Sequence, residues 1–65
     1  MGSGFYAPLR DMLLAHGCER IRQGKGSHEI WYSPINKARF PVSVTVENRH
    51  TANGILKQAG IDKKL

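Results

Sequence analysis

Residues 24–32, GKGSHEIWY, join a glycine-rich turn to a segment with strand character. A four-residue connection that contains glycine is typical of a β-hairpin. We therefore predict two antiparallel strands, at residues 18–23 and 28–33, on either side of the turn. Neighbours in a strand point to opposite faces, so one of Trp31 and Tyr32 belongs to the core, and periodicity does not say which.

A second turn and a third strand follow. Residues 33–37, SPINK, combine proline and asparagine as turns do. In residues 40–46, three valines at every second position (Val42, Val44 and Val46) alternate with Ser43 and Thr45. Strict alternation predicts a strand with one buried face and one face in water.

Amphipathic segments lie on both sides of the three strands. In residues 7–16 the apolar side chains recur at helical spacing, with His16 on the same face and Gly17 as the C-terminal cap. In residues 51–59 a short apolar stripe predicts a second helix, with Thr51 as its N-cap. Gly60 can end this helix, and Ile61 can then fold back onto the preceding turn.

Two helices and a half-buried sheet need the same core. The economical solution is an α+β fold of order α-β-β-β-α, with a three-stranded antiparallel sheet and both helices on one face. Residues 1–65 form a single domain, with residues 1–6 as a flexible arm and residues 62–65 as a polar tail. So small a core has no room for a deep cavity, so any chemistry belongs on an open face.

The charge balance points to a polyanionic partner. Ten Lys and Arg residues face five Asp and Glu residues, which gives a net charge of +5. RNA, DNA, an acidic protein and an anionic membrane would all fit this charge. The absence of a basic amphipathic helix disfavours the membrane, and neither helix carries the face that major-groove readout of DNA requires.

The remaining compositional signals favour the cytoplasm. Cys18 is the single cysteine, so no internal disulfide can form, and we expect it in the core. No signal peptide or membrane span is recognisable. No Cys/His cluster has the spacing of a zinc site and no paired carboxylates stand out, so we expect no metal and no cofactor.

Two motifs carry a resemblance to a known family: GSH at residues 26–28 and ILKQAGI at residues 55–61. With this order of elements, residues 9–61 resemble the HicA toxins of bacterial toxin–antitoxin systems. The resemblance implies a fold similar to double-stranded-RNA-binding domains, an mRNA endoribonuclease activity with His28 as the catalytic residue, and a HicB-like antitoxin that covers the site. Residues 46–51 form a shorter segment than in many members, so only His28 is carried over and His50 stays unassigned.

The turn offers chemistry that suits RNA cleavage. Histidine in general titrates near neutral pH and can act as a base toward the 2′-OH of RNA. Lys25 and the turn's backbone N–H groups could stabilise the phosphate, Gly26 would let it approach closely, and Ser27 could donate a hydrogen bond to it. This chemistry would be a metal-independent transesterification, in which the group that protonates the leaving oxygen is unassigned.

The first predicted strand carries two arginines, and the sequence leaves two simpler interpretations of the site open. Arg20 and Arg22 alternate along the first strand and so should share a sheet face, where phosphate binding and plain solvation are both open. The turn could serve hairpin geometry alone. The chain could also be a noncatalytic RNA-binding module of the same fold, which cleavage that depends on His28 would distinguish from an enzyme.

Overall fold

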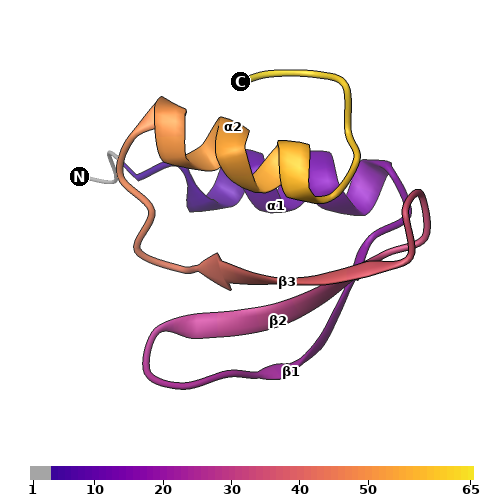
Figure 1. The fold of residues 1–65 in the computed structure, drawn as a ribbon. Helices are drawn as coiled ribbons and strands as arrows, with labels where there is room; N and C mark the ends of the chain where they lie inside the picture. The colour runs from indigo at the N-terminus through magenta and orange to yellow at the C-terminus, as the bar shows by residue number, and fades with distance from the viewer. Residues whose placement is uncertain (1–3) are drawn as a thin grey trace.

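A computed structural model describes residues 4–65 of the protein. Its elements are α1 (Tyr6–Ala15), β1 (Glu19–Gln23), β2 (His28–Ser33), β3 (Ala38–Ser43) and α2 (Arg49–Gln58). The three strands form one antiparallel sheet in the order β1-β2-β3. Both helices lie on one face of this sheet (Figure 1). The predicted α+β fold, similar to that of double-stranded-RNA-binding domains, is confirmed.

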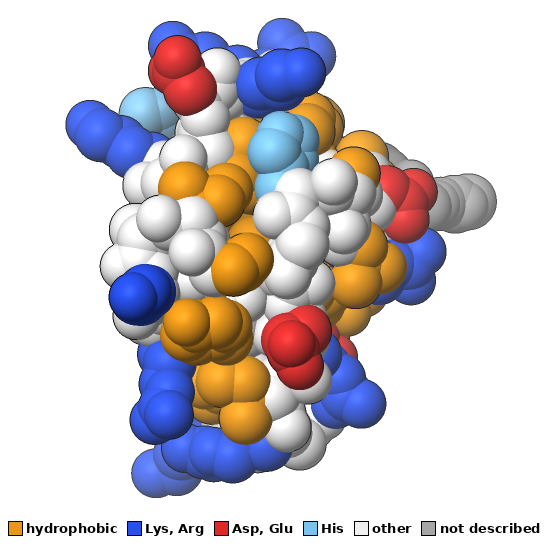
Figure 2. Space-filling view, turned by 90° about the vertical axis from the view of Figure 1, so that its right-hand side faces the viewer, with side chains coloured by type: hydrophobic (Ala, Val, Ile, Leu, Met, Phe, Trp, Pro, Cys, Tyr) orange, Lys and Arg blue, Asp and Glu red, His pale blue; other side chains and the backbone are white. Residues whose placement is uncertain are grey.

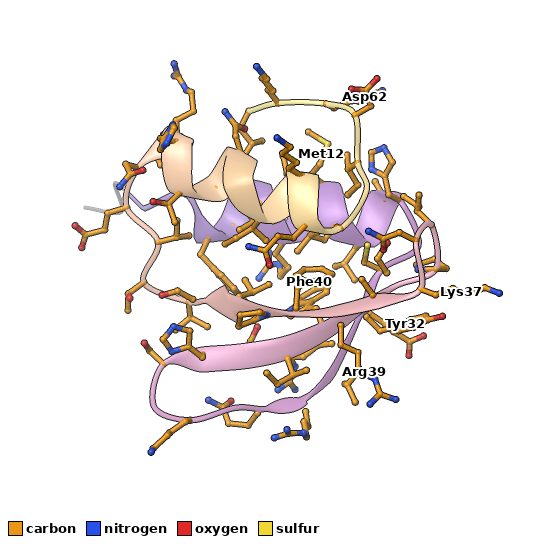
Figure 3. The ribbon with its side chains drawn as sticks, viewed as in Figure 1. Met12, Tyr32, Lys37, Arg39, Phe40 and Asp62 are labelled. Carbon is orange, nitrogen blue, oxygen red and sulfur yellow. The ribbon has the colours of Figure 1, made fainter. Side chains whose placement is uncertain are left out.

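The core lies between the helices and the sheet. Leu9 and Leu13 of α1, Leu56 of α2 and Val42 of β3 have no exposed surface. Figure 3 shows Phe40 pointing from the sheet toward the helices. Full burial of such side chains contributes about 1.5–3 kcal/mol each, so this single layer of contacts supplies most of the stability.

Strand β2 settles which of its two neighbouring aromatic residues belongs to the core. Trp31 is only 2% exposed and faces the helices, whereas Tyr32 is half-buried on the opposite face. Figure 3 shows Tyr32 on the side of the sheet away from the helices. Cys18 is also buried, as predicted.

Both helices end in the predicted manner. Gly17 and Gly60 have φ angles of +86° and +77°, the left-handed conformation that glycine adopts at little cost. The residue after each glycine donates its N–H to a helix carbonyl at 3.0 Å, Cys18 to Leu13 and Ile61 to Leu56. These are Schellman motifs, and they turn the chain sharply back onto the core.

The third strand differs from the prediction of residues 40–46. It begins at Ala38 and ends at Ser43. The Ser43 hydroxyl accepts the N–H of Thr45 at 3.2 Å, and the Val46 N–H donates to the Ser43 carbonyl at 3.3 Å. This local turn competes with the strand, as serine side chains often do, so the alternating valines do not extend the ladder.

The start of the second helix also differs from the prediction. The N-cap is Asn48 rather than Thr51, because the Asn48 side chain accepts the N–H of Thr51 at 2.7 Å. Asparagine is a better N-cap than threonine, so the helix begins one turn earlier than predicted. Gly54 lies in the middle of α2, where glycine costs about 1 kcal/mol relative to alanine.

Parts of the predicted arm and of the predicted tail make specific contacts with the rest of the fold. Residues 1–3 of the arm lie outside the described residues. Phe5 donates its N–H to the Val46 carbonyl at 2.9 Å and packs against the core, and Tyr6 already belongs to α1. At the other end, Leu65 packs against the core and donates its N–H to Asn53 Oδ1 at 2.7 Å. Both ends of the described chain are therefore held by specific contacts.

Candidate active site

The β1–β2 turn needs both of its glycines for backbone reasons. Gly26 has a φ of +62° and follows Lys25, whose carbonyl accepts the His28 N–H at 3.1 Å. A glycine at the first central position with positive φ is typical of a type II′ hairpin turn. A Cβ on Gly24 would lie 3.0 Å from the His28 carbonyl oxygen, to which Gly24 also donates at 2.8 Å. The hairpin interpretation of the turn is therefore sound in itself.

In residues 25–27 of this turn, hydrogen bonds involve the carbonyl groups and not the backbone N–H groups, as far as the described residues show. Its three consecutive carbonyls are all acceptors: Lys25 from the His28 N–H at 3.1 Å, Gly26 from the Gln23 side chain at 3.1 Å, and Ser27 from the Val44 N–H at 2.9 Å. Within residues 4–65, the N–H groups of residues 25–27 have no acceptor. Successive free N–H groups in a turn form an anion-binding concavity.

His28 lies beside these groups on the open side of the sheet. It is the first residue of β2 and is exposed, while its neighbour Glu29 is buried on the helix side. His28, Ile30 and Tyr32 therefore share one face. With their partners on β3 (Ser43, Pro41 and Arg39) they make up what we call the outer sheet face. Figure 3 shows Tyr32 and Arg39 together on this side.

Ser43 is a candidate that the sequence analysis missed. It pairs directly with His28, so the two side chains leave the outer sheet face next to each other. Its hydroxyl lies 3.0 Å from the Thr45 hydroxyl. Register could have revealed it, because pairing Ser33 with Ala38 across the second turn also pairs residues 28 and 43.

The predicted arginine pair is separated by a bulge in β1. Arg20 pairs with Trp31 and Arg22 pairs with Ile30, so one residue between them has no partner. A β-bulge shifts the alternation by one residue. Arg22 therefore lies on the outer sheet face, diagonal to His28, whereas Arg20 lies on the helix side. The prediction that they share a face is wrong.

A buried carboxylate behind His28 also went unnoticed in the sequence. Glu29 accepts the Tyr6 hydroxyl at 2.7 Å and the Trp31 indole N–H at 3.0 Å, and Arg20 Nε lies 4.0 Å from it. Burial and the neighbouring Glu29 raise the pKa of the Tyr6 hydroxyl. The alternation of β2 places Glu29 on the core side with Trp31, and a carboxylate there needs donors. These bonds tie the start of β2 to α1 and so fix the strand that carries His28.

The surface around the site is basic. Lys25, Arg22 and Arg39 are exposed, and the chain as a whole carries +5. Exposed basic side chains of this kind attract phosphates. Figure 2 views the opposite end of the molecule, at the β2–β3 turn, where hydrophobic side chains lie between Lys and Arg side chains, so the basic character is not confined to the site.

Within residues 4–65 no group of three or more His, Cys, Asp and Glu side chains could hold a metal ion. No helix in the same range is long and apolar enough to cross a membrane.

The geometry thus brings together His28, the turn at residues 25–27 and Arg22, and it adds Ser43, while Arg20 lies on the other face. Searches of curated proteins and of solved structures found no match. The family model described as the HicA toxin of bacterial toxin–antitoxin systems matches residues 9–61, which is most of the chain. The chain belongs to the HicA toxin family.

Proposed function

We propose that this toxin is an mRNA endoribonuclease that cuts RNA without a metal ion and uses His28 as its catalytic residue. One observation carries the proposal: in a basic turn, an exposed histidine directly follows three consecutive residues whose N–H groups have no acceptor within the described residues 4–65. Such an arrangement provides a base and a phosphate-binding concavity side by side. Membership of a toxin family supplies the context for this activity.

In the proposed reaction the His28 imidazole accepts the proton of the ribose 2′-OH. The 2′ oxygen then attacks phosphorus, and the bond between phosphorus and the 5′ oxygen breaks. The products are a 2′,3′-cyclic phosphate and a 5′-hydroxyl, whose proton comes from water or from the imidazolium. The N–H groups of Gly26 and Ser27, together with Lys25, would stabilise the charge that develops on the phosphate oxygens.

The outer sheet face would hold the RNA strand. Arg22 lies diagonal to His28, and Ser43 lies directly opposite it, so both could contact phosphates on either side of the cut. Tyr32 is half-buried at the far end of the same face, where a base could stack on it for about 1–3 kcal/mol. Arg20 is the one predicted phosphate ligand that this arrangement leaves out.

The proposal includes a protein partner and a compartment. A HicB-like antitoxin would cover the turn and the outer sheet face, with acidic groups opposite Lys25 and Arg22. Within the described residues, neither helix carries the face that major-groove readout of DNA requires. Action on mRNA would require a cytoplasmic location. A complex in which His28 and Lys25 were both open to solvent would contradict simple occlusion of the site.

A noncatalytic RNA-binding module remains the second candidate, and one feature of the site favours it. On the outer sheet face, within the described residues, His28 has no second imidazole beside it to protonate the leaving oxygen. The same basic face would then serve affinity alone.

The experiment uses purified protein, EDTA and two labelled RNAs of one sequence, one of them fully 2′-O-methylated. We expect cleavage of the unmodified RNA, products with a cyclic phosphate end, and an intact methylated RNA, because methylation removes the nucleophile. Binding of both RNAs without cleavage of either would refute the enzyme and favour the binding module. Cleavage of the methylated RNA would refute the proposed mechanism.

A further inference from the structure

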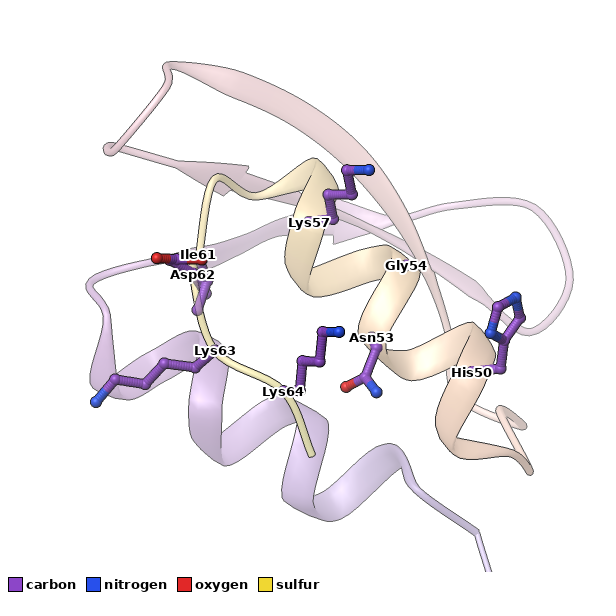
Figure 4. Close-up of a pocket in the computed structure, with 8 residues that line it drawn as sticks. All are labelled: His50, Asn53, Gly54, Lys57, Ile61, Asp62, Lys63 and Lys64. Atoms are coloured by element: carbon purple, nitrogen blue, oxygen red, sulfur yellow. The ribbon is translucent and has the colours of Figure 1, made fainter.

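A second basic site lies on the side of the helices. A groove of about 620 Å³ runs between α2 and the C-terminal segment (Figure 4). It is lined by His50, Asn53, Gly54 and Lys57 of α2 and by residues 61–64. Helix α2 packs against β3 on its other side, so this groove is separate from the outer sheet face that carries His28.

The groove has an excess of positive charge that the protein does not neutralise. Its lining includes three lysines and one histidine against the single carboxylate of Asp62. Within residues 4–65 no carboxylate lies within 4.0 Å of Lys57, Lys63 or Lys64. Figure 4 shows Lys64 in the space between the C-terminal segment and α2, whereas the side chains of Lys57 and Lys63 extend outward from the rim of the groove. Unpaired lysines in and around one groove attract an anionic ligand.

The walls of the groove are held in place by the fold. The Schellman motif at Gly60 directs the chain back, and Ile61 is buried. At the other end of the segment Leu65 donates its N–H to Asn53 Oδ1 at 2.7 Å. The lysines at residues 63 and 64 therefore stand on a segment fixed at both of its ends.

The glycine on the groove surface has no role in the fold. Gly54 has no positive φ, and a Cβ built on it would meet nothing within 4 Å. Alanine would stabilise the helix at this position and would fit without strain. A glycine that the fold does not require, at the surface of a basic groove, leaves bare backbone for the close approach of a ligand.

The lining favours a nucleic acid over a protein segment. Lysine is depleted at protein–protein interfaces, whereas aromatic and other large apolar anchors are enriched there. This groove has three lysines, and its one large apolar residue, Ile61, is only 5% exposed. We propose that the groove binds the phosphate backbone of the RNA that is cut at His28, as a second anchoring site. The identity of the ligand rests on the proposed function.

The test measures binding of a fluorescein-labelled, fully 2′-O-methylated RNA at several salt concentrations. A plot of log affinity against log salt has a negative slope, and each lost phosphate contact makes that slope less negative by about 0.7 for a single strand. We expect this change for Lys57→Gln and for Lys64→Gln. Lys37→Asn is the matched control, because it removes one charge at a turn with a φ of +57°, which asparagine tolerates, and it should leave the slope unchanged.

Gly54→Ala separates a binding role from a structural one. We expect its melting temperature to rise by roughly 4–8 °C, since a helix glycine is replaced in a small domain. The same variant should bind the RNA several-fold more weakly, because the methyl group blocks close approach. Higher stability with unchanged affinity would overturn the inference.

The remaining outcomes separate this inference from the proposed function. Cleavage that depends on His28, together with lysine variants that behave like Lys37→Asn, would overturn the groove alone. Groove-dependent binding without any cleavage of unmodified RNA would overturn the enzyme alone. If Lys57→Gln and Lys64→Gln lose binding to a polyglutamate peptide but bind RNA as the wild type does, the groove binds an acidic protein. That result would also overturn the inference.

Discussion

Ser33 joins the sheet to the end of α2, and its replacement by alanine tests how this small fold is held together. Ser33 is fully buried at the end of β2. Its hydroxyl donates to the Ala59 carbonyl at 2.6 Å and accepts the Ile35 N–H at 3.2 Å. The Ala59 carbonyl lies just past the last helical residue, where helix carbonyls have no partner of their own. Ser33→Ala would therefore leave this carbonyl unsatisfied.

The size of the effect follows from that orphaned carbonyl. An unsatisfied buried acceptor costs about 1–3 kcal/mol. A domain of this length has a total stability of about 3–10 kcal/mol, so the variant should lose a large fraction of it. The melting temperature should fall by roughly 4–8 °C for each kcal/mol lost.

Urea denaturation and thermal melting measure this loss directly. Ser43→Ala is the matched control, because the Ser43 hydroxyl is only partly buried and bonds to nearby Thr45, so water can replace its contacts. We expect the control to lose well under half as much stability as Ser33→Ala. Equal losses in the two variants would refute the assignment of Ser33 as the link between the sheet and α2.

Three further predictions follow from the same structure. Gly24→Ala should destabilise the hairpin by about 1–3 kcal/mol in urea denaturation, because its Cβ would lie 3.0 Å from a backbone oxygen, and a wild-type midpoint would contradict this. Asn48→Ala should cost about 1 kcal/mol by the same method and Thr51→Ala much less, and the reverse order would restore the threonine cap. The raised pKa of Tyr6 means that its contribution is present below pH 10 and is lost as the pH rises through the folded-state pKa. The urea midpoint of the wild type should therefore fall more steeply above pH 10 than that of Tyr6→Phe, and parallel pH profiles would contradict the contact with Glu29.

The fold was predictable because local signals agreed with one another. The two glycines after the helices, the glycine-rich turn and the Pro-Asn turn all mark chain reversals, and the structure has them there. The errors arose where a polar side chain competes with regular structure. The Ser43 hydroxyl ends the third strand early, and the Asn48 side chain caps the second helix one turn before the predicted residue.

The candidate site was only partly predictable. The turn and His28 could be located from their motif, but the neighbours of His28 depend on strand register. Direct pairing brings Ser43 beside His28, and the bulge in β1 moves Arg20 to the helix side. A bulge has no reliable signal in five residues that are all exposed, so this separation needed the three-dimensional arrangement.

The most direct test of the central claim compares the wild type with His28→Ala on one defined RNA in the presence of EDTA. Both proteins should fold and bind the RNA, because His28 is exposed and makes no core contact. The account predicts that the wild type cuts the RNA and that the variant does not. Equal cleavage by the two folded proteins would contradict it.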